Sequence, residues 1–104
     1  MKEKFDHVIG GNIPALVDFS ADWCQPCKMM SPVLKQLKDK MGDRIRIIKV
    51  DVDRNPDLAA RYRIHSVPSL LLFQDGNLKW SGSGVMSAGH LEGIISRNVS
   101  VPAA

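Results

Sequence analysis

The chain has 104 residues, of which 44% are hydrophobic and 24% are charged. This length is typical of one domain, and the composition is that of an ordinary soluble globular protein, which excludes a disordered chain. The formal net charge of +3 is too small, and the Lys and Arg residues are too scattered along the chain, to predict nucleic-acid binding.

The first residues of the chain do not resemble a targeting signal. Residues 1–7 are mostly polar, and Val8 and Ile9 are followed directly by two glycines, so the apolar region of a signal peptide does not fit there. No apolar run approaches the ~20 residues needed to cross a bilayer. We expect a soluble cytoplasmic protein that binds no membrane, although an export signal removed before residue 1 would leave the same sequence.

The chain begins with a predicted helix and a predicted strand. Residues 4–9 suit a short helix, and Gly10 and Gly11 disfavour its continuation. Residues 15–20 are apolar without clean alternation, which is typical of a strand covered on both faces in a parallel or mixed sheet. Asp18, in the middle of this strand, is the residue that the apolar pattern does not explain.

A longer helix and a second strand follow. Between Pro26 and Gly42 apolar residues recur at spacings of three and four, which predicts one apolar helix face. This face consists of Cys27, Met30, Leu34, Leu37 and Met41. The three methionines of the segment are expected to fill the core, namely Met29, Met30 and Met41. A β-rich run over residues 45–52 then completes a β-α-β unit.

The second half of the chain starts with a short helix and a hairpin. Asn55 is suited to cap a helix over residues 57–62. Residues 69–74 and 78–83 predict two strands, and the turn sequence between them, residues 75–77, is a strong hairpin signal.

A final amphipathic helix closes the predicted series. Ser87 is placed to cap it, and its apolar residues are Leu91, Ile94, Ile95 and Val99. Residues 100–104 are expected to fray. The resulting order of helices and strands predicts an α/β fold, a three-layer α/β/α sandwich with a central mixed four-stranded sheet, as a single domain over 1–104 with its core at 5–98.

Cys24 and Cys27 carry the sharpest chemical signal. They are the only cysteines, and two residues separate them where the first strand gives way to the long helix. Unpaired N–H groups and the helix dipole favour a thiolate at Cys24, whereas Cys27 lies on the apolar face of the helix. We therefore expect Cys24 to be exposed and nucleophilic, and Cys27 to be sheltered and to resolve the mixed disulfide.

Two other interpretations of the cysteine pair carry less weight. A zinc site needs further ligands, but His7, His65 and His90 are scattered along the chain. A purely structural disulfide between Cys24 and Cys27 would close too small a loop to constrain the unfolded chain much. We expect no metal and no bound cofactor.

The segment Ala21-Asp22-Trp23-Cys24-Gln25-Pro26-Cys27-Lys28 closely resembles the active-site segment Trp-Cys-Gly-Pro-Cys-Lys of the thioredoxin family. Further segments fall in family order and spacing: Val17-Asp18-Phe19, Ser31-Pro32, 49–53, Asn55-Pro56, Val67-Pro68-Ser69 and 73–76. The resemblance implies a thioredoxin fold and a monomeric protein-disulfide reductase that cycles between a Cys24/Cys27 dithiol and disulfide. Its implied partners are disulfide-containing substrate proteins and a thioredoxin reductase that draws electrons from NADPH or ferredoxin.

The resemblance also implies roles for residues outside the cysteine pair. Asp18 resembles the buried carboxylate that assists proton transfer when the second cysteine attacks, and Lys49 resembles the neighbour that holds its charge. Pro68 resembles a cis-proline whose preceding residue pairs its backbone with the substrate. The edge of the hydrophobic docking surface is implied at Trp23, Pro26, Val67 and Gly84. From the residues alone, Asp18 could instead face outward at a bulge, and Lys49 could be a solvated edge residue.

The sequence departs from the family pattern at several places. Gln25 replaces the usual Gly, which affects the expected reduction potential, and Ser20 stands where an aromatic residue is common. His65-Ser66 occupies a position where a Gly is common, which affects the expected substrate choice. The family's first strand has no counterpart, so we expect the sheet edge at residues 45–51 to be open to pairing.

Two other functions stay open at this point. The same fold could serve as an oxidant or isomerase of an exported compartment, but the pair Gln25-Pro26 lacks the His of the oxidising relatives. Alternatively, the domain could be a binding or assembly module in which the cysteines are incidental.

Overall fold

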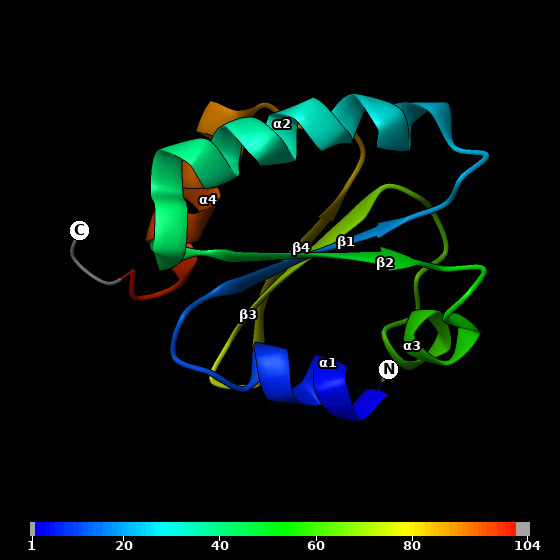
Figure 1. The fold of residues 1–104 in the computed structure, drawn as a ribbon, viewed down its shortest axis with the longest axis horizontal. Coiled ribbons are helices and arrows are strands. Elements are labelled where there is room, and N and C mark those ends of the chain that lie inside the picture. Colours follow the sequence, from blue (N-terminus) through cyan, green and yellow to red (C-terminus); the bar gives the residue numbers. More distant parts are fainter. Residues whose placement is uncertain (1, 102–104) are drawn as a thin grey trace.

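Three layers make up the fold, with helices on both faces of one sheet (Figure 1). The structure, a computed structural model, describes residues 2–101 apart from the side chains of Lys2 and Glu3. The helices are α1 (Lys2–Ile9), α2 (Gln25–Met41), α3 (Pro56–Arg61) and α4 (Ala88–Asn98), with a 3-10 turn at Gly42–Arg44. Helices α2 and α4 cover one face of the sheet, and α1 and α3 cover the other (Figure 1). The predicted three-layer α/β/α architecture is confirmed.

The middle layer is a mixed sheet of four strands in the order β2-β1-β3-β4. The strands are β1 (Ala15–Ser20), β2 (Arg46–Asp51), β3 (Ser69–Gln74) and β4 (Asn77–Ser83). Strand β1 pairs in parallel with β2 and antiparallel with β3, and β3 pairs antiparallel with β4. Among the described residues β2 is an edge strand, as the sequence predicted.

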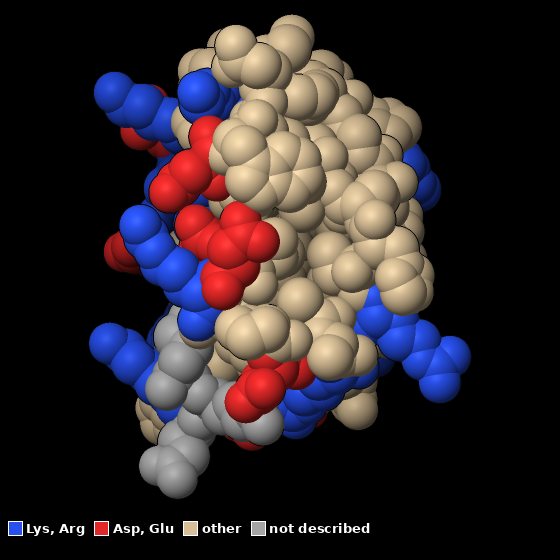
Figure 2. Space-filling model, turned by 90° about the vertical axis from the view of Figure 1, so that its right-hand side faces the viewer, with Lys and Arg blue, Asp and Glu red and all other residues tan. Residues whose placement is uncertain are grey.

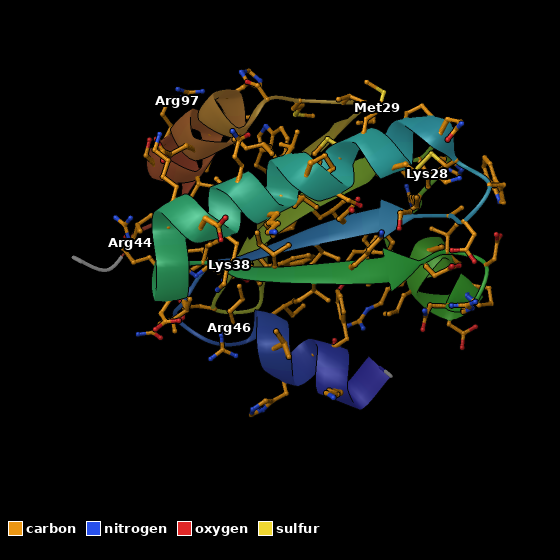
Figure 3. The ribbon with its side chains drawn as sticks, turned by 45° about the horizontal axis from the view of Figure 1, so that its top comes forward. Lys28, Met29, Lys38, Arg44, Arg46 and Arg97 are labelled. Atoms are coloured by element: carbon orange, nitrogen blue, oxygen red, sulfur yellow. A yellow bond between two sulfur atoms is a disulfide. The ribbon has the colours of Figure 1, made fainter. Side chains whose placement is uncertain are left out.

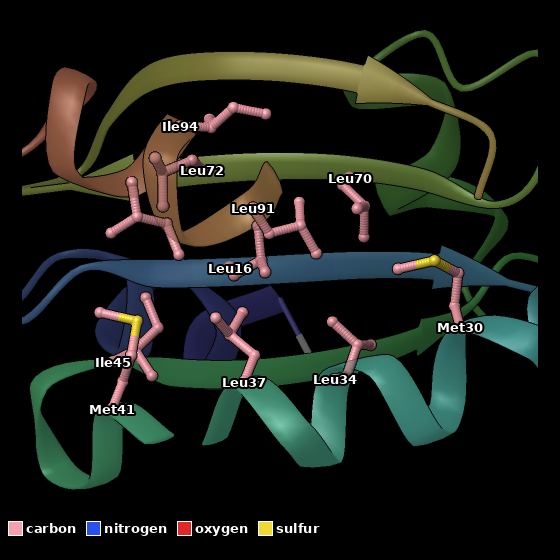
Figure 4. Close-up of a cluster of buried hydrophobic side chains, with 11 residues drawn as sticks. Leu16, Met30, Leu34, Leu37, Met41, Ile45, Leu70, Leu72, Leu91 and Ile94 are labelled. Carbon is pink, nitrogen blue, oxygen red and sulfur yellow. The ribbon is translucent and has the colours of Figure 1, made fainter. Parts of the chain in front are cut away.

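Strand β1 is buried along its whole length, as its unbroken apolar pattern predicted. Its alternate side chains enter two different apolar layers. Leu16 packs with Met30 and Leu34 of α2, in the cluster that Figure 4 shows. Val17 and Phe19 point to the other face, where the cluster includes side chains of α1 and α3. The sheet is therefore held between two cores, and any polar side chain of β1 is also enclosed.

Helix α2 buries the predicted apolar face and ends at Met41, and its C-cap, Gly42, has a φ of 59°. The prediction for its methionines was wrong at one position, because Met29 is 61% exposed while Met30 and Met41 are buried. Adjacent helical residues point about 100° apart, and with Met30 directed at the sheet, Met29 lies beyond the edge of the buried face. Figure 3 shows Met29 on the outer side of α2.

The N-terminal caps of α3 and α4 differ from each other. Helix α3 begins at Pro56, and Asn55 occupies its cap position without capping it, since the Asn55 Nδ2 donates to the Asp51 carbonyl at 3.0 Å. The predicted side-chain cap at Asn55 was wrong. At α4 the Ser87 Oγ accepts the His90 N–H at 3.1 Å, which confirms the predicted cap.

The predicted hairpin joins β3 to β4. Asp75 and Gly76 have φ values of 54° and 80°, as the tight turns of twisted hairpins require. At the end of β3, Gln74 exchanges two hydrogen bonds with the backbone of Ser100, of 2.6 Å and 3.0 Å. Ser100, predicted to belong to a frayed tail, is thus paired, while residues 102–104 lie outside the described residues.

Candidate active site

A disulfide joins Cys24 and Cys27, whose Cα atoms are 5.3 Å apart. Cys24 occupies the N-cap position of α2, and its Sγ accepts the Cys27 N–H at 3.1 Å. Pro26 lies in the first turn, where its missing N–H leaves no helix hydrogen bond unmade. The first sulfur therefore receives both a helix N–H group and the positive end of the helix dipole, and both stabilise a thiolate.

The expected difference in exposure between the two cysteines was wrong for the disulfide-bonded state. Cys24 is 3% exposed and Cys27 is 2% exposed. Both pack with Ala21 in a small apolar cluster that Val52 and Val67 cover. What distinguishes the sulfurs is their position relative to the helix start, because Cys24 receives the amide hydrogen bond and Cys27 lies on the buried face of α2.

The loop before β3 lies against the disulfide. The Val67–Pro68 peptide bond is cis, as the resemblance predicted. The Val67 carbonyl oxygen is 3.6 Å from Cys24 Sγ, and no described residue accepts a hydrogen bond from the Val67 N–H. The Pro68 carbonyl accepts the N–H of Gly84 at 2.9 Å, and Gly84 has a φ of 89°, which favours glycine. Chain segments that are distant in sequence thus meet beside the sulfurs.

Asp18 lies beneath the start of α2. It is fully buried, and neither carboxylate oxygen has a hydrogen-bond partner among the described residues. It is two residues from Leu16 along β1, so both side chains point to the face that α2 covers, and β1 leads directly toward that helix. Lys49 and Leu70 are its partners in the register of the two neighbouring strands. The predicted burial is confirmed, and an outward-facing Asp18 is excluded.

Burial determines the proton affinity of this carboxyl group. Desolvation raises the pKa of Asp18 from 3.8 to about 6, and the positive charge of Lys49 opposes that rise. Lys49 is exposed on the edge strand and donates from Nζ to Ser31 Oγ at 3.4 Å. It thus acts on Asp18 through its charge and without a hydrogen bond, so it is both a solvated edge residue and the electrostatic neighbour of Asp18.

An uncharged surface surrounds the disulfide. Figure 2 shows a broad area without charged groups on this side of the molecule, with Asp, Glu, Lys and Arg at its margins. Trp23 is 70% exposed and Val85 is 45% exposed, and Pro26 and Met29 are also exposed. Sequence reasoning predicted Trp23 and Pro26 for the docking surface, and the exposed Met29 and Val85 were not among the residues predicted for it.

The Trp23 indole is held by a contact that the sequence did not indicate. Its Nε1 donates to Asp53 Oδ2 at 2.9 Å. Both residues follow the carboxyl end of a strand, Trp23 after β1 and Asp53 after β2, and these strands are parallel neighbours. The carboxyl ends of parallel strands meet at one sheet edge. The positions of Trp23 and Asp53 directly after two such strands could therefore have predicted that the two side chains lie close together.

Other chemistry has no support in the part of the chain that the structure describes. There, no group of three or more His, Cys, Asp or Glu side chains could hold a metal ion. In the same part of the chain, every helix is too short or too polar to span a membrane. The redox group of the site is the disulfide of the chain itself.

Comparisons with known proteins agree with this geometry. Residues 1–97 match the family model described as Thioredoxin. The chain is 42% identical to Thioredoxin 1 of Chlorobaculum tepidum over 87 residues, which is 83% of this chain and 86% of that protein. It is 39% identical to the thioredoxin of Bacillus subtilis over 84 residues, which is 81% of each.

Solved structures that are similar to this one include thioredoxins as well. A mutant thioredoxin from Halobacterium salinarum superimposes with a TM-score of 0.86 at 34% identity, covering 97% of this chain and 88% of that one. Oxidised mitochondrial thioredoxin 3 from Saccharomyces cerevisiae gives a TM-score of 0.82 at 35% identity, with 92% and 89% covered. The chain therefore belongs to the thioredoxin family, and it is a thiol–disulfide oxidoreductase that reduces protein disulfides through its own cysteine pair, without a bound cofactor.

Proposed function

We propose that this single-domain chain acts as a monomer in the cytoplasm, with Cys24 as the nucleophile and Cys27 as the resolving thiol. A thioredoxin reductase supplies the electrons that convert the disulfide to the dithiol. The observation that carries the assignment of roles is the hydrogen bond from the Cys27 N–H to Cys24 Sγ at 3.1 Å. It favours the thiolate at the first sulfur, because a hydrogen bond to the charged form lowers a pKa.

The first half-reaction forms a mixed disulfide. The Cys24 thiolate attacks one sulfur of the substrate disulfide, a bond forms between the two sulfurs, and the electron pair of the broken bond leaves on the second substrate sulfur. That thiolate takes a proton from water. The uncharged surface at Trp23, Pro26, Val67, Pro68 and Gly84 receives the substrate, and the free Val67 N–H supports backbone pairing with it.

The second half-reaction releases the substrate. Cys27 loses its proton to Asp18, and its thiolate attacks Cys24 Sγ, which expels the other substrate sulfur and restores the disulfide. A proton acceptor works best when its pKa is near the working pH, and burial raises the pKa of Asp18 to about 6. The charge of Lys49 limits that rise and keeps Asp18 largely ionised at neutral pH.

A reduction assay tests the proposal. The wild-type chain, driven by a thioredoxin reductase with NADPH, should reduce a model protein disulfide, and the double variant Cys24→Ser, Cys27→Ser should not. Equilibration with dithiol buffers of known potential distinguishes the direction, since an oxidant would have a less stable disulfide than a reductant. A double variant that retains full biological function would favour an assembly module and refute the proposal.

A further inference from the structure

A cavity lies beside the loop that precedes the cis-proline. Its volume is about 290 Å³, and it opens between that loop and the ends of β3 and β4. Its polar lining consists of Arg63, His65, Ser66, Ser69, Ser81 and Ser83. No lining residue is acidic. The cavity therefore combines a permanent positive charge with several hydroxyl groups, a lining suited to an anion.

The strand register places the serines of this cavity. Ser69 pairs with Ser83, and Leu71 pairs with Ser81, so these side chains share one face of the sheet. Ser69 Oγ is already used, because it donates to the Ser66 carbonyl at 2.6 Å. The hydroxyls of Ser66, Ser81 and Ser83 are exposed and have no hydrogen-bond partner among the described residues. Three hydroxyl donors are thus available to a ligand.

Arg63 differs from its neighbour Arg61. The Arg61 guanidinium binds Asp6 Oδ1 at 2.8 Å and lies over the Tyr62 ring. The Arg63 side chain forms no hydrogen bond or ion pair with any described residue. Its backbone has a φ of 54°, a conformation that strains most side chains and favours glycine. Arg63 thus has a strained backbone, and its side chain has no partner among the described residues.

The loop that lines this polar cavity also lines a cavity at the active-site surface. This cavity is smaller, about 130 Å³, and mainly apolar; its lining includes Trp23, Val52 and Val67, and the two valines pack against the cysteines. The two cavities share Ile64, His65 and Ser66. The polar cavity therefore lies next to the loop that ends at Val67, where the substrate backbone is proposed to pair.

We propose that the polar cavity binds a carboxylate side chain of the substrate protein, through the Arg63 guanidinium and the hydroxyls of Ser81 and Ser83. This inference rests on the proposed function and adds a substrate class to it: disulfides that have an Asp or Glu nearby in the chain. A guanidinium and a carboxylate form two parallel, charge-assisted hydrogen bonds, and the serine hydroxyls can donate further hydrogen bonds to the same carboxylate. The strain at Arg63 is then offset when substrate is bound.

Matched peptide substrates test this selectivity. Peptides with one disulfide carry either Glu or Gln at successive positions on each side of the cysteine, and kcat/KM is measured at low ionic strength. One position should show a preference for Glu of about fivefold, and salt should weaken it. Arg63→Gly, which also relieves the backbone strain, should remove that ratio, and Arg63→Lys should restore part of it.

Arg46→Gln is the matched control, because it removes one exposed positive charge at the far end of β2 (Figure 3). It should leave the Glu/Gln ratio unchanged. Equal rates for Glu and Gln peptides at every position, or a ratio that Arg46→Gln removes as effectively as Arg63→Gly, would overturn the inference.

A binding measurement separates this inference from the redox proposal. The double variant Cys24→Ser, Cys27→Ser cannot react, so NMR titration with the Glu peptide reports binding alone. Shifts at Arg63, Ser81 and Ser83 that the Gln peptide does not cause would support the cavity assignment even if reduction fails. Shifts confined to Trp23 and Val67 would refute it while leaving the redox proposal intact.

Discussion

The two ends of α2 show how one helix can serve both stability and chemistry (Figure 3). At its C-terminal end, cationic side chains bind carbonyl groups of the last turn and of the segment that follows it. Arg44 donates to the carbonyls of Met41 and Lys40, and Lys38 Nζ donates to those of Gly42 and Ile45. At its N-terminal end, an amide group points at a sulfur that exchanges electrons.

The dipole of α2 therefore has opposite uses at the two ends of the helix. The carbonyl end binds permanent positive charges, which fixes the turn into β2. The amide end binds a sulfur whose negative charge appears only after reduction, and the surrounding surface carries few charges of its own. Changes at the amide end should alter the reaction, and changes at the carbonyl end should alter stability alone.

The largest expected effect is at the two cysteines. Cys24→Ser should abolish turnover, because the nucleophile is lost, whereas Cys27→Ser should stop after the first step and accumulate a mixed disulfide with substrate. Mass spectrometry after alkylation would detect the trapped species. Alkylation of both thiols at equal rates near neutral pH in the reduced protein would contradict the assignment.

The second largest effect is expected from the substitution of Asp18, which changes how stability depends on pH. A pKa raised from 3.8 to about 6 means that the folded protein holds a proton between these values that the unfolded chain has released. Stability therefore falls as pH rises through this window and levels off above it. Asp18→Asn, which cannot ionise, should be as stable as wild type near pH 3 and more stable by about 3 kcal/mol at pH 7.

The same variant should slow the reaction. Without the proton acceptor, attack by Cys27 on the mixed disulfide should be slower by about 10²-fold. Denaturant titration of the oxidised protein at several pH values measures the first effect, and single-turnover kinetics measures the second. A variant that is less stable at every pH and resolves the mixed disulfide at the normal rate would show that Asp18 is structural only.

The third largest effect is a loss of stability from a substitution at the carbonyl end of α2. Lys38→Met removes two hydrogen bonds from Nζ, of 2.8 Å and 2.6 Å, and keeps the aliphatic stem. We expect a loss of about 1 to 2 kcal/mol in the free energy of unfolding, because a charged donor leaves two carbonyls. The rate of substrate reduction and the reduction potential should not change. A shifted potential would contradict the separation of the two ends.

The sequence predicted most of this fold, since its signals are local. The period of α2, the covered strand β1 and the turn after Gln74 each depend on neighbouring residues alone. Asp18 was recognisable because a carboxylate within an apolar strand interrupts its pattern, although the sequence alone also allowed it to face outward at a bulge. These features need no knowledge of tertiary contacts.

The parts that the sequence did not predict depend on distant contacts. The apolar period of α2 does not indicate how much of the helix circumference faces the core, so it could not predict that Met29 is exposed. Asn55 has a good capping side chain, but the Asp51 carbonyl competes for it. The burial of Cys24 depends on Val67, which is distant in sequence and reaches the sulfur through the cis-proline loop.

The smallest expected effect is at Lys49, which links the exposed edge of the sheet to the buried carboxylate. Lys49 opposes the rise in the Asp18 pKa, so Lys49→Gln should raise that pKa further above its ordinary value. Less Asp18 would then be ionised near pH 6, and the Cys27 step should be slower by about two- to threefold there. At higher pH the rates of variant and wild type should converge, because Asp18 is ionised in both.

Lys49→Arg is the matched variant, because it keeps the positive charge and should leave the pH profile near that of wild type. High salt should shrink the difference between Lys49→Gln and wild type, since Lys49 is exposed and its charge is screened. The measurements are single-turnover rates across the pH range and a carbon-13 NMR titration of the Asp18 carboxyl group. An unchanged titration in Lys49→Gln would show that the ammonium group is only solvated, and that desolvation alone sets the proton affinity of Asp18.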